Sequence, residues 1–357
     1  MAIPKEAAAL VAKINKEHGE GAVVSGSDMV LGKRYPTGSL GLDIILSGGW
    51  PGNQWVEVIG KESNGKTAIV LKTIAENQRL DPDFTTLWIA AEHYDADQAE
   101  ALGVDNSRVI VVPTQEMEFA YETILSFAES KSIDCAVLDS YPALIPGEEA
   151  NKAMDESVMA VGARLTGKFF RKAGAATKRA LDGSERPFLG IIINQYRDQI
   201  GGFSPHGTPQ TTPGGNAKNY FFYTRVQVKR DEFIDEKNPA GGKVRVGQKI
   251  KIQTIKHKAG PPGQIATISF YFRDAPTSGF KRGDYDIADE LVTYGQVYGL
   301  IQRAGAYYKI GDQKWGPGRE KLAEVLRENR EFRQELHEAT LSAAAEPDAL
   351  REDEADE

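Results

Sequence analysis

The octapeptide GKESNGKT, at residues 60–67, has the residue types and the spacing to bind a chain of phosphates. It fits the pattern G-x-x-x-x-G-K-[ST], in which backbone N–H groups hold phosphate oxygens. Lys66 would reach the β- and γ-phosphates, and the hydroxyl of Thr67 would ligate Mg²⁺. The loop lies between a strand pattern and a helix pattern, which is the context that this motif requires. The sequence therefore predicts a nucleoside triphosphate site.

The same loop contains Glu62, a carboxylate within a cradle for anions. A local interpretation is that Glu62 caps the helix that follows. A functional interpretation is that it pairs with cations in the pocket and helps to couple the nucleotide state to a subunit interface. The sequence leaves both interpretations open.

Polar side chains follow three of the apolar runs. Asp139 ends "CAVLD", and P-loop proteins hold Mg²⁺ with an acid at this point of a core strand. Glu92 follows "LWIAA", where it would activate the attacking water or be a salt-bridged surface acid. Asn194 and Gln195 end "IIINQ", and Gln195 would either sense the γ-phosphate or cap the strand.

Basic residues gather in two places. The segment "ARLTGKFFRKAGAATKR" holds six basic residues from Arg164 to Arg179 and no acid. Four of them fall near one helix face, which is either a solvated face or a stripe that binds a phosphate backbone. Lys256 and Lys258 alternate along a strand pattern, so both point to one side. They would be solvent charges, or they would reach the γ-phosphate of a neighbouring subunit.

Alternating strand and helix patterns must position these residues. Apolar runs without alternation indicate strands that are covered on both faces, and they occur at 55–60, 85–92, 134–140 and 187–195. Helix patterns occur at 66–80 and 117–130. Alternating patterns at 224–233 and 247–259 predict antiparallel strands. The sequence thus predicts an α/β fold with a largely parallel sheet.

Additional segments flank this core. Residues 4–18 have helical spacing of apolar residues, and "AVVSG" (22–26) is a short strand candidate. The stretch 196–217 is rich in glycine and proline, and long loops of this kind are usually functional or disordered. A smaller α/β segment begins near residue 275 and ends in a charged helix pattern at 318–340.

The composition indicates a globular chain of about two domains, with 357 residues of which 41% are hydrophobic. The sequence contains no run of about 18 apolar residues, so it predicts no membrane-spanning helix. The single cysteine, Cys135, fits a reducing cytoplasm. The last twelve residues hold seven acids and one arginine, so they carry −6 of the net charge of −8. The rest of the chain is therefore nearly neutral and can present basic patches.

Nine stretches together resemble the bacterial RecA-type recombinases, including those carried by phages. They are "TGSLGLDIILSGG", "GKESNGKT", "AAEH", "LGVD", "AVLDS", "NQYR", "TTPGGNA", "KHK" and "AGAYYKIGDQKWGPG", in the family's order and near its spacing. The resemblance covers about residues 4 to 340. One phosphate loop is weakly specific, but nine ordered stretches are very specific.

The resemblance implies a RecA-like ATPase that uses ATP and Mg²⁺, forms a helical filament on single-stranded DNA and exchanges strands with a homologous duplex. It implies work in DNA recombination, DNA repair and the SOS response, and partners that include single-strand-binding and loader proteins. The implied parts are an oligomerisation helix and strand at 1–33, an ATPase core at 34–274 with DNA loops at 148–161 and 196–214, a C-terminal α/β domain at 275–345 and an acidic disordered tail at 346–357.

The resemblance also implies site residues. The catalytic residues would be Lys66, Thr67, Glu92, Asp139, Gln195, Lys256 and Lys258, with Thr67 and Asp139 at the metal and the last two lysines acting on a neighbour's ATP. The nucleotide would contact Gly60, Lys61, Glu62, Ser63, Asn64, Gly65, Lys66, Thr67 and Ala68, and Tyr94 or Asp95 would replace an adenine-stacking tyrosine. DNA would contact Met159, Arg164, Arg171, Arg197, Ile200, Gly214, Gly215 and Asn216. Tyr220 would lie at a subunit contact.

The second loop departs from the family pattern, because it is longer and carries Asp198 and Gln199 where an apolar and a basic residue are expected. Two other functions stay open from the sequence. One is a ring helicase or an ATP-driven regulatory module without strand exchange, and the other is a DNA-binding scaffold without ATP hydrolysis.

Overall fold

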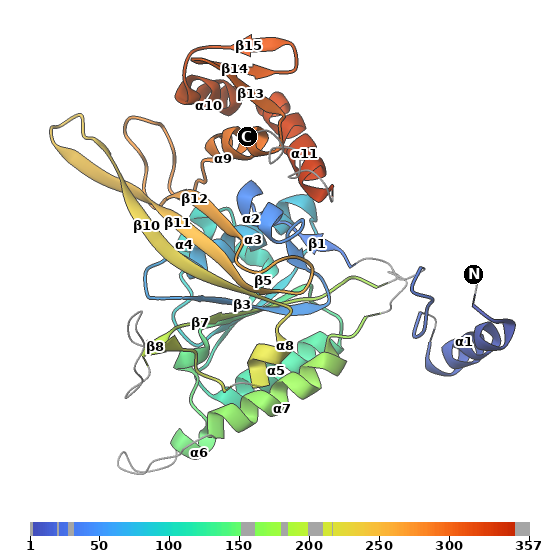
Figure 1. The fold of residues 1–357 in the computed structure, drawn as a ribbon. Helices are drawn as coiled ribbons and strands as arrows, with labels where there is room; N and C mark the ends of the chain where they lie inside the picture. Colours follow the sequence, from blue (N-terminus) through green and yellow to red (C-terminus); the bar gives the residue numbers. More distant parts are fainter. Residues whose placement is uncertain are drawn as a thin grey trace.

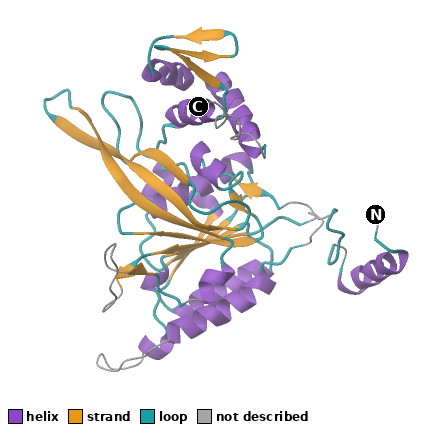
Figure 2. Cartoon of the chain, viewed as in Figure 1, coloured by secondary structure: helices purple, strands orange, loops and turns teal. Residues whose placement is uncertain are grey.

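The computed structural model describes residues 3–19, 21–27, 32–150, 161–179, 185–198, 210–215 and 217–346 (Figures 1 and 2). Its centre is an eight-stranded sheet in the order β12-β11-β10-β3-β7-β6-β4-β5. The strands are β3 (Gln54–Gly60), β4 (Thr86–Ala90), β5 (Val109–Pro113), β6 (Cys135–Asp139), β7 (Leu189–Asn194), β10 (Thr224–Lys237), β11 (Lys243–His257) and β12 (Ile265–Tyr271). Strands β10 to β5 in this order run parallel, whereas β11 and β12 are antiparallel. The predicted, mostly parallel α/β fold is confirmed.

Helices cover both faces of the sheet. One face carries α2 (Leu40–Ile45), α3 (Lys66–Leu80) and α4 (Ala96–Ala101), whose apolar residues join the first core cluster. The other face carries α5 (Met117–Glu129) and α7 (Val161–Ala176), seen below the sheet in Figure 1. All residues of β4, β6 and β7 are buried, which explains why their sequences are apolar without alternation.

Short elements complete the core. They are β1 (Arg34–Tyr35) with β2 (Trp50–Pro51), β8 (Arg197–Asp198) with β9 (Gln210–Thr211), α6 (Gly147–Ala150) and α8 (Ala217–Phe221). The outer half of the β10–β11 hairpin extends beyond the sheet (Figure 1). Most of the two predicted DNA loops, at 148–161 and 196–214, and the predicted tail from residue 347 lie outside the described residues.

The strand predicted at 22–26 is not formed in this chain. The helix before it is present as α1 (Lys5–His18), and every residue of α1 stays at least partly exposed in the described part of the chain. Asn15 of this helix donates to the backbone oxygen of Val23 at 2.9 Å and accepts from its N–H at 2.8 Å. Because these two backbone groups are already paired, Val23 cannot use them in a strand ladder.

The C-terminal segment contains α9 (Ile287–Val297), β13 (Ile301–Ala304), β14 (Tyr307–Ile310), β15 (Gln313–Trp315), α10 (Arg319–Glu328) and α11 (Arg330–Ala345). The single helix predicted at 318–340 is wrong, because α10 and α11 are separate. Between them Asn329 has extended backbone angles, and its side chain accepts from the N–H of Phe332 at 3.0 Å. This cap begins a new helix where the periodicity alone predicts none.

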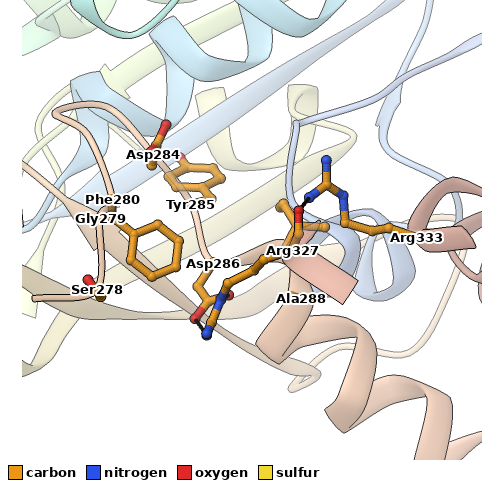
Figure 3. Close-up of a pocket in the computed structure, with 10 residues that line it drawn as sticks. Ser278, Gly279, Phe280, Asp284, Tyr285, Asp286, Ala288, Arg327 and Arg333 are labelled. Atoms are coloured by element: carbon orange, nitrogen blue, oxygen red, sulfur yellow. Dashed lines mark hydrogen bonds and ion pairs between the residues drawn. The ribbon is translucent and has the colours of Figure 1, made fainter. Parts of the chain in front are cut away.

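The C-terminal segment has its own apolar core, which also includes Leu40 of α2. A cavity of about 370 Å³ in the C-terminal segment is lined in part by Asp286 and Arg327, whose side chains meet in Figure 3. Arg327 donates to Asp286 at 2.6 Å and to Glu320 at 2.6 Å. Arg327 is therefore paired with acids of the C-terminal segment, and these pairs link the start of α9 to α10.

Candidate functional site

The phosphate loop joins the end of β3 to the start of α3. Gly65 caps α3 with φ at 93°, in the left-handed region that favours glycine. A Cβ at Gly60 would lie 2.4 Å from the backbone oxygen of Val228, so that position also requires glycine. Within the described residues no side chain caps α3, so its first N–H groups can bind an anion.

The two predicted phosphate and metal ligands meet at the start of α3. The ammonium of Lys66 donates to the backbone oxygen of Lys61 at 2.9 Å, and Thr67 Oγ1 donates to Asp139 Oδ2 at 3.0 Å. The pKa of Asp139 is raised to about 6, because burial and the charge of Glu92 outweigh the bond from Thr67 and the charge of Lys66, which lower it. Burial lowers the pKa of Lys66, against the effect of Asp139, Glu92 and Glu62. The pair can therefore exchange these contacts for phosphate and a metal ion.

Three strand ends gather beside this pair. Glu92 N donates to Asp139 O at 2.9 Å, and Ser140 donates to Glu92 Oε1. Gln195, which follows β7, donates from Nε2 to the same Glu92 oxygen at 3.5 Å. The partners of Glu92 in these contacts are neutral donors that face the site, which favours the catalytic interpretation over a salt-bridged surface acid. The arrangement can hold a water in line with the γ-phosphate.

These groups line a cavity of about 670 Å³, a size suited to a nucleotide. One wall is the loop and its neighbours, and the other comes from β10, β11, β12 and the residues after them. The second wall includes Arg230, Phe233, Phe270 and Phe272. Sequence reasoning missed this wall, although Phe270 and Phe272 are two residues apart and therefore share a side of the strand pattern.

The structure does not bring Tyr94 and Asp95 into this cavity. The hydroxyl of Tyr94 donates to Asn106 Oδ1 at 2.7 Å, and its ring packs at 5.3 Å from that of Trp88. Tyr94 lines a separate hollow of about 400 Å³ beside the site. Asp95 caps α4 by accepting from Gln98 N at 2.9 Å. Both side chains are thus held by local contacts.

Glu62 lies exposed on the rim of the cavity. The helix-cap interpretation finds no support, because the cap of α3 is Gly65 and within the described residues no side chain bonds to that helix start. The charge of Glu62 instead raises the pKa of Lys66. The charge of Glu62 thus favours the protonated form of Lys66.

Lys256 and Lys258 are absent from the described residues that line the cavity. Lys256 Nζ donates to the backbone oxygens of Asn219 at 2.7 Å and Tyr220 at 3.1 Å. Lys258 follows the end of β11 and lies 5.7 Å from the centre of the Tyr223 ring. Tyr220 is 81% exposed. Within one chain these lysines do not reach the nucleotide cavity.

The predicted DNA contacts are only partly described. On α7, Arg164, Lys168, Arg171 and Lys172 are all exposed, so the basic stripe is present. Arg179 is not part of it, because its guanidinium is buried and donates to backbone oxygens such as that of Ala128 at 3.2 Å.

The second DNA loop is described only at its ends. Arg197 belongs to the β8–β9 pair, and Gly214 and Gly215 have φ values of 103° and 73°. A Cβ at Gly214 would lie 2.8 Å from Lys218 Cδ, so the backbone approaches that side chain closely. Met159, Ile200 and Asn216 lie outside the described residues.

A phosphate loop, acids on adjacent strand ends and a mostly parallel sheet define the class of P-loop ATPases. The model of the RecA N-terminal domain matches residues 5–276, and that of the RecA C-terminal domain matches residues 289–345. Protein RecA of Thermus thermophilus is 34% identical over 333 residues, which cover 92% of this chain and 91% of that protein. Protein RecA of Nitratiruptor sp. is 33% identical over 344 residues, which cover 95% of this chain and 93% of that protein. Protein RecA of Chlorobaculum parvum is 30% identical over 329 residues, which cover 91% of this chain and 88% of that protein.

The chain therefore belongs to the RecA family, and it is a DNA-dependent ATPase of DNA recombination and repair. In the described part of the chain, no helix is long and apolar enough to cross a membrane.

Proposed function

We propose that this chain is an ATP-dependent recombinase that forms a helical filament on single-stranded DNA and exchanges strands with a homologous duplex. One observation gives this proposal its strongest support. A line of contacts runs from Thr67 and Asp139 through Glu92 to Gln195, the residue at the start of the second loop. A change at that loop can therefore alter the position of the group that activates water.

The chemistry follows from the geometry. The triphosphate enters at the N-terminus of α3, where Lys66 exchanges the backbone oxygen of Lys61 for phosphate oxygens. Glu92 orients the attacking water and accepts its proton, and Gln195 holds Glu92 through Oε1. We place the adenine ring of ATP against Phe233, Phe270 or Phe272 rather than Tyr94, because these three rings line the same cavity as the phosphate loop.

Thr67 and Asp139 fit a hard cation with oxygen ligands. Mg²⁺ held there would neutralise charge and align the β- and γ-phosphate oxygens. Among the described residues no cluster of three or more His, Cys, Asp or Glu side chains forms a complete metal cage. This fits an ion that takes most of its ligands from phosphates and water.

The assembly is supported by surfaces that one chain leaves unused. Strand β5 ends the sheet, and its Ile110 and Val111 are 38% and 37% exposed. Leu10 of α1 is 57% exposed. The exposed apolar side of a neighbour's α1 could cover such an edge. The same packing would bring Lys256 and Lys258 to the ATP of the adjacent subunit.

The test measures phosphate release from ATP by the purified chain with and without single-stranded DNA, and images the same samples by electron microscopy. We expect strong stimulation, helical filaments and exchange of a labelled strand. ATP hydrolysis without a response to DNA, in a protein that stays monomeric, would contradict the proposal. Closed rings in place of helices would favour the ring helicase or regulatory module.

A further inference from the structure

Glu57 is a completely buried carboxylate that lies on β3, three residues before the phosphate loop. It accepts from Lys218 Nζ at 2.9 Å, from Arg225 Nε at 2.6 Å and from Asn194 Nδ2 at 2.7 Å. The side chain of Lys218 is 2% exposed, and burial is the main cause that lowers its pKa. None of these four groups has a role in the nucleotide chemistry described above.

The partners of Glu57 belong to the two ends of the second loop. Asn194 ends β7, just before that loop, and its Nδ2 also donates to the backbone oxygen of Pro213 at 3.4 Å. Lys218 follows the loop and donates to Thr212 Oγ1 at 2.6 Å. The entry and the exit of the loop are therefore both tied to one carboxylate on the strand that carries the phosphate loop.

The same group of residues connects to the water-activating carboxylate. Asn194 Oδ1 accepts from the backbone N–H of Gln195 at 2.8 Å, and Gln195 Nε2 donates to Glu92 Oε1 at 3.5 Å. A buried carboxylate is costly without its cationic partners, so Glu57 and Lys218 must stay paired when the loop exit moves. The contacts thus run without a break from Thr212 through Lys218 and Glu57 to Asn194 and Gln195.

We propose that Glu57 and Lys218 form a clamp that couples the second loop to Glu92. Both are positioning residues, because they act through Asn194 and Gln195 and touch no reacting atom. The inference rests on the proposed function, in which the second loop binds DNA. It predicts that the clamp determines how much DNA stimulates ATP hydrolysis, and not how the chain binds ATP.

Lys218→Met is the main variant, since it removes the ammonium but leaves Glu57 with Arg225 and Asn194. Lys72→Met is the control, because Lys72 is a partly buried lysine whose pKa burial also lowers, 5.3 Å from the Tyr285 ring and outside the clamp. We expect Lys218→Met to keep the DNA-free kcat and the KM for ATP within about twofold and to lower the stimulation by single-stranded DNA about tenfold. Lys72→Met should retain full stimulation.

Thr212→Val provides a second measurement that leaves the buried ion pairs intact. It removes the hydroxyl that accepts from Lys218 Nζ at 2.6 Å and from Arg225 Nη2 at 3.4 Å, so it should lower the stimulation in the same direction without lowering the melting temperature. Normal stimulation in both variants would overturn the clamp, and so would equal loss of DNA-free and DNA-stimulated activity in Lys218→Met. If the unsubstituted chain shows no stimulation by DNA, the proposed function itself fails, which is a different result.

Discussion

Raising the pH should weaken the contact between α9 and the start of α2. Glu290 of α9 is 4% exposed, and its Oε2 accepts from Ser39 Oγ at 2.8 Å and from Gly41 N at 2.9 Å. In the described part of the chain its other oxygen, Oε1, has no partner. The pKa of Glu290 is raised to about 8, mainly by burial and also by the charges of Asp43 and Asp286, although the bonds from Gly41 and Ser39 lower it. The folded chain therefore holds a proton that the unfolded chain loses.

The sign and the size follow from linkage. The ordinary pKa of the glutamate carboxyl is 4.5. The contribution of protonated Glu290 to the free energy of unfolding is therefore complete below pH 4.5 and is lost as the pH rises toward 8. Each pH unit between the two values lowers the free energy of unfolding by about 1.4 kcal/mol. Between pH 5 and pH 7 the expected loss is about 3 kcal/mol.

The assay is urea unfolding at several pH values from 5 to 8, with Glu290→Gln as the comparison. The amide is neutral throughout and keeps an oxygen for Ser39 and Gly41, so the difference between the two chains isolates the titration of Glu290. Asp43, whose pKa is raised to about 7 mainly by burial, titrates in both chains, so the comparison leaves the titration of Glu290 together with its interaction with Asp43. Glu335→Gln, on the exposed side of α11, is the control. A difference in unfolding free energy that stays constant from pH 5 to 7 would refute the reasoning.

Three predictions concern the nucleotide site. Lys66→Ala should lower the DNA-stimulated kcat about 100-fold or more, because it removes the ammonium aimed at the phosphates, and steady-state phosphate release measures this. Phe272→Ala should weaken ATP binding about fivefold, and Tyr94→Phe should leave it unchanged, as measured by displacement of a fluorescent nucleotide. If Tyr94→Phe weakened binding and Phe272→Ala did not, the adenine ring would bind beside Tyr94 instead. Glu62→Gln should reduce the difference in salt resistance between ATP and ADP filaments in light scattering, and an unchanged difference would count against its coupling role.

Local patterns predicted the elements that hold the phosphate loop. The helix predicted at 66–80 has the same bounds as α3, because the motif, the preceding strand and the apolar spacing agree. The prediction of a single helix was wrong between α10 and α11, because the side chain of Asn329 caps a new helix within a continuous helical pattern. The prediction of a strand was also wrong at residues 22–26, where Asn15 pairs with the backbone groups that a strand would use.

The far wall of the cavity could not be predicted from local patterns. Phe270 and Phe272 reach the site only because β11 and β12 join the sheet beyond β10. Glu57 did leave a sign in the sequence, since it is the one charged residue in the apolar run "WVEVIG". Its partner Lys218 is 161 positions away, and only the strand order brings the two together.

Strand order also explains why one contact can serve as the link between DNA and hydrolysis. Strand β7 lies between β3 and β6, so its last residue, Asn194, contacts Glu57 on one side, and the next residue, Gln195, contacts Glu92 on the other. The bond from Gln195 to Glu92 is long at 3.5 Å, near the limit of a hydrogen bond, so a small shift would make or break it. The bonds within the clamp, at 2.6 to 2.9 Å, are short and include buried charges. Movement of the loop ends should therefore change the weak contact at Gln195 first, which is where the chemistry can respond.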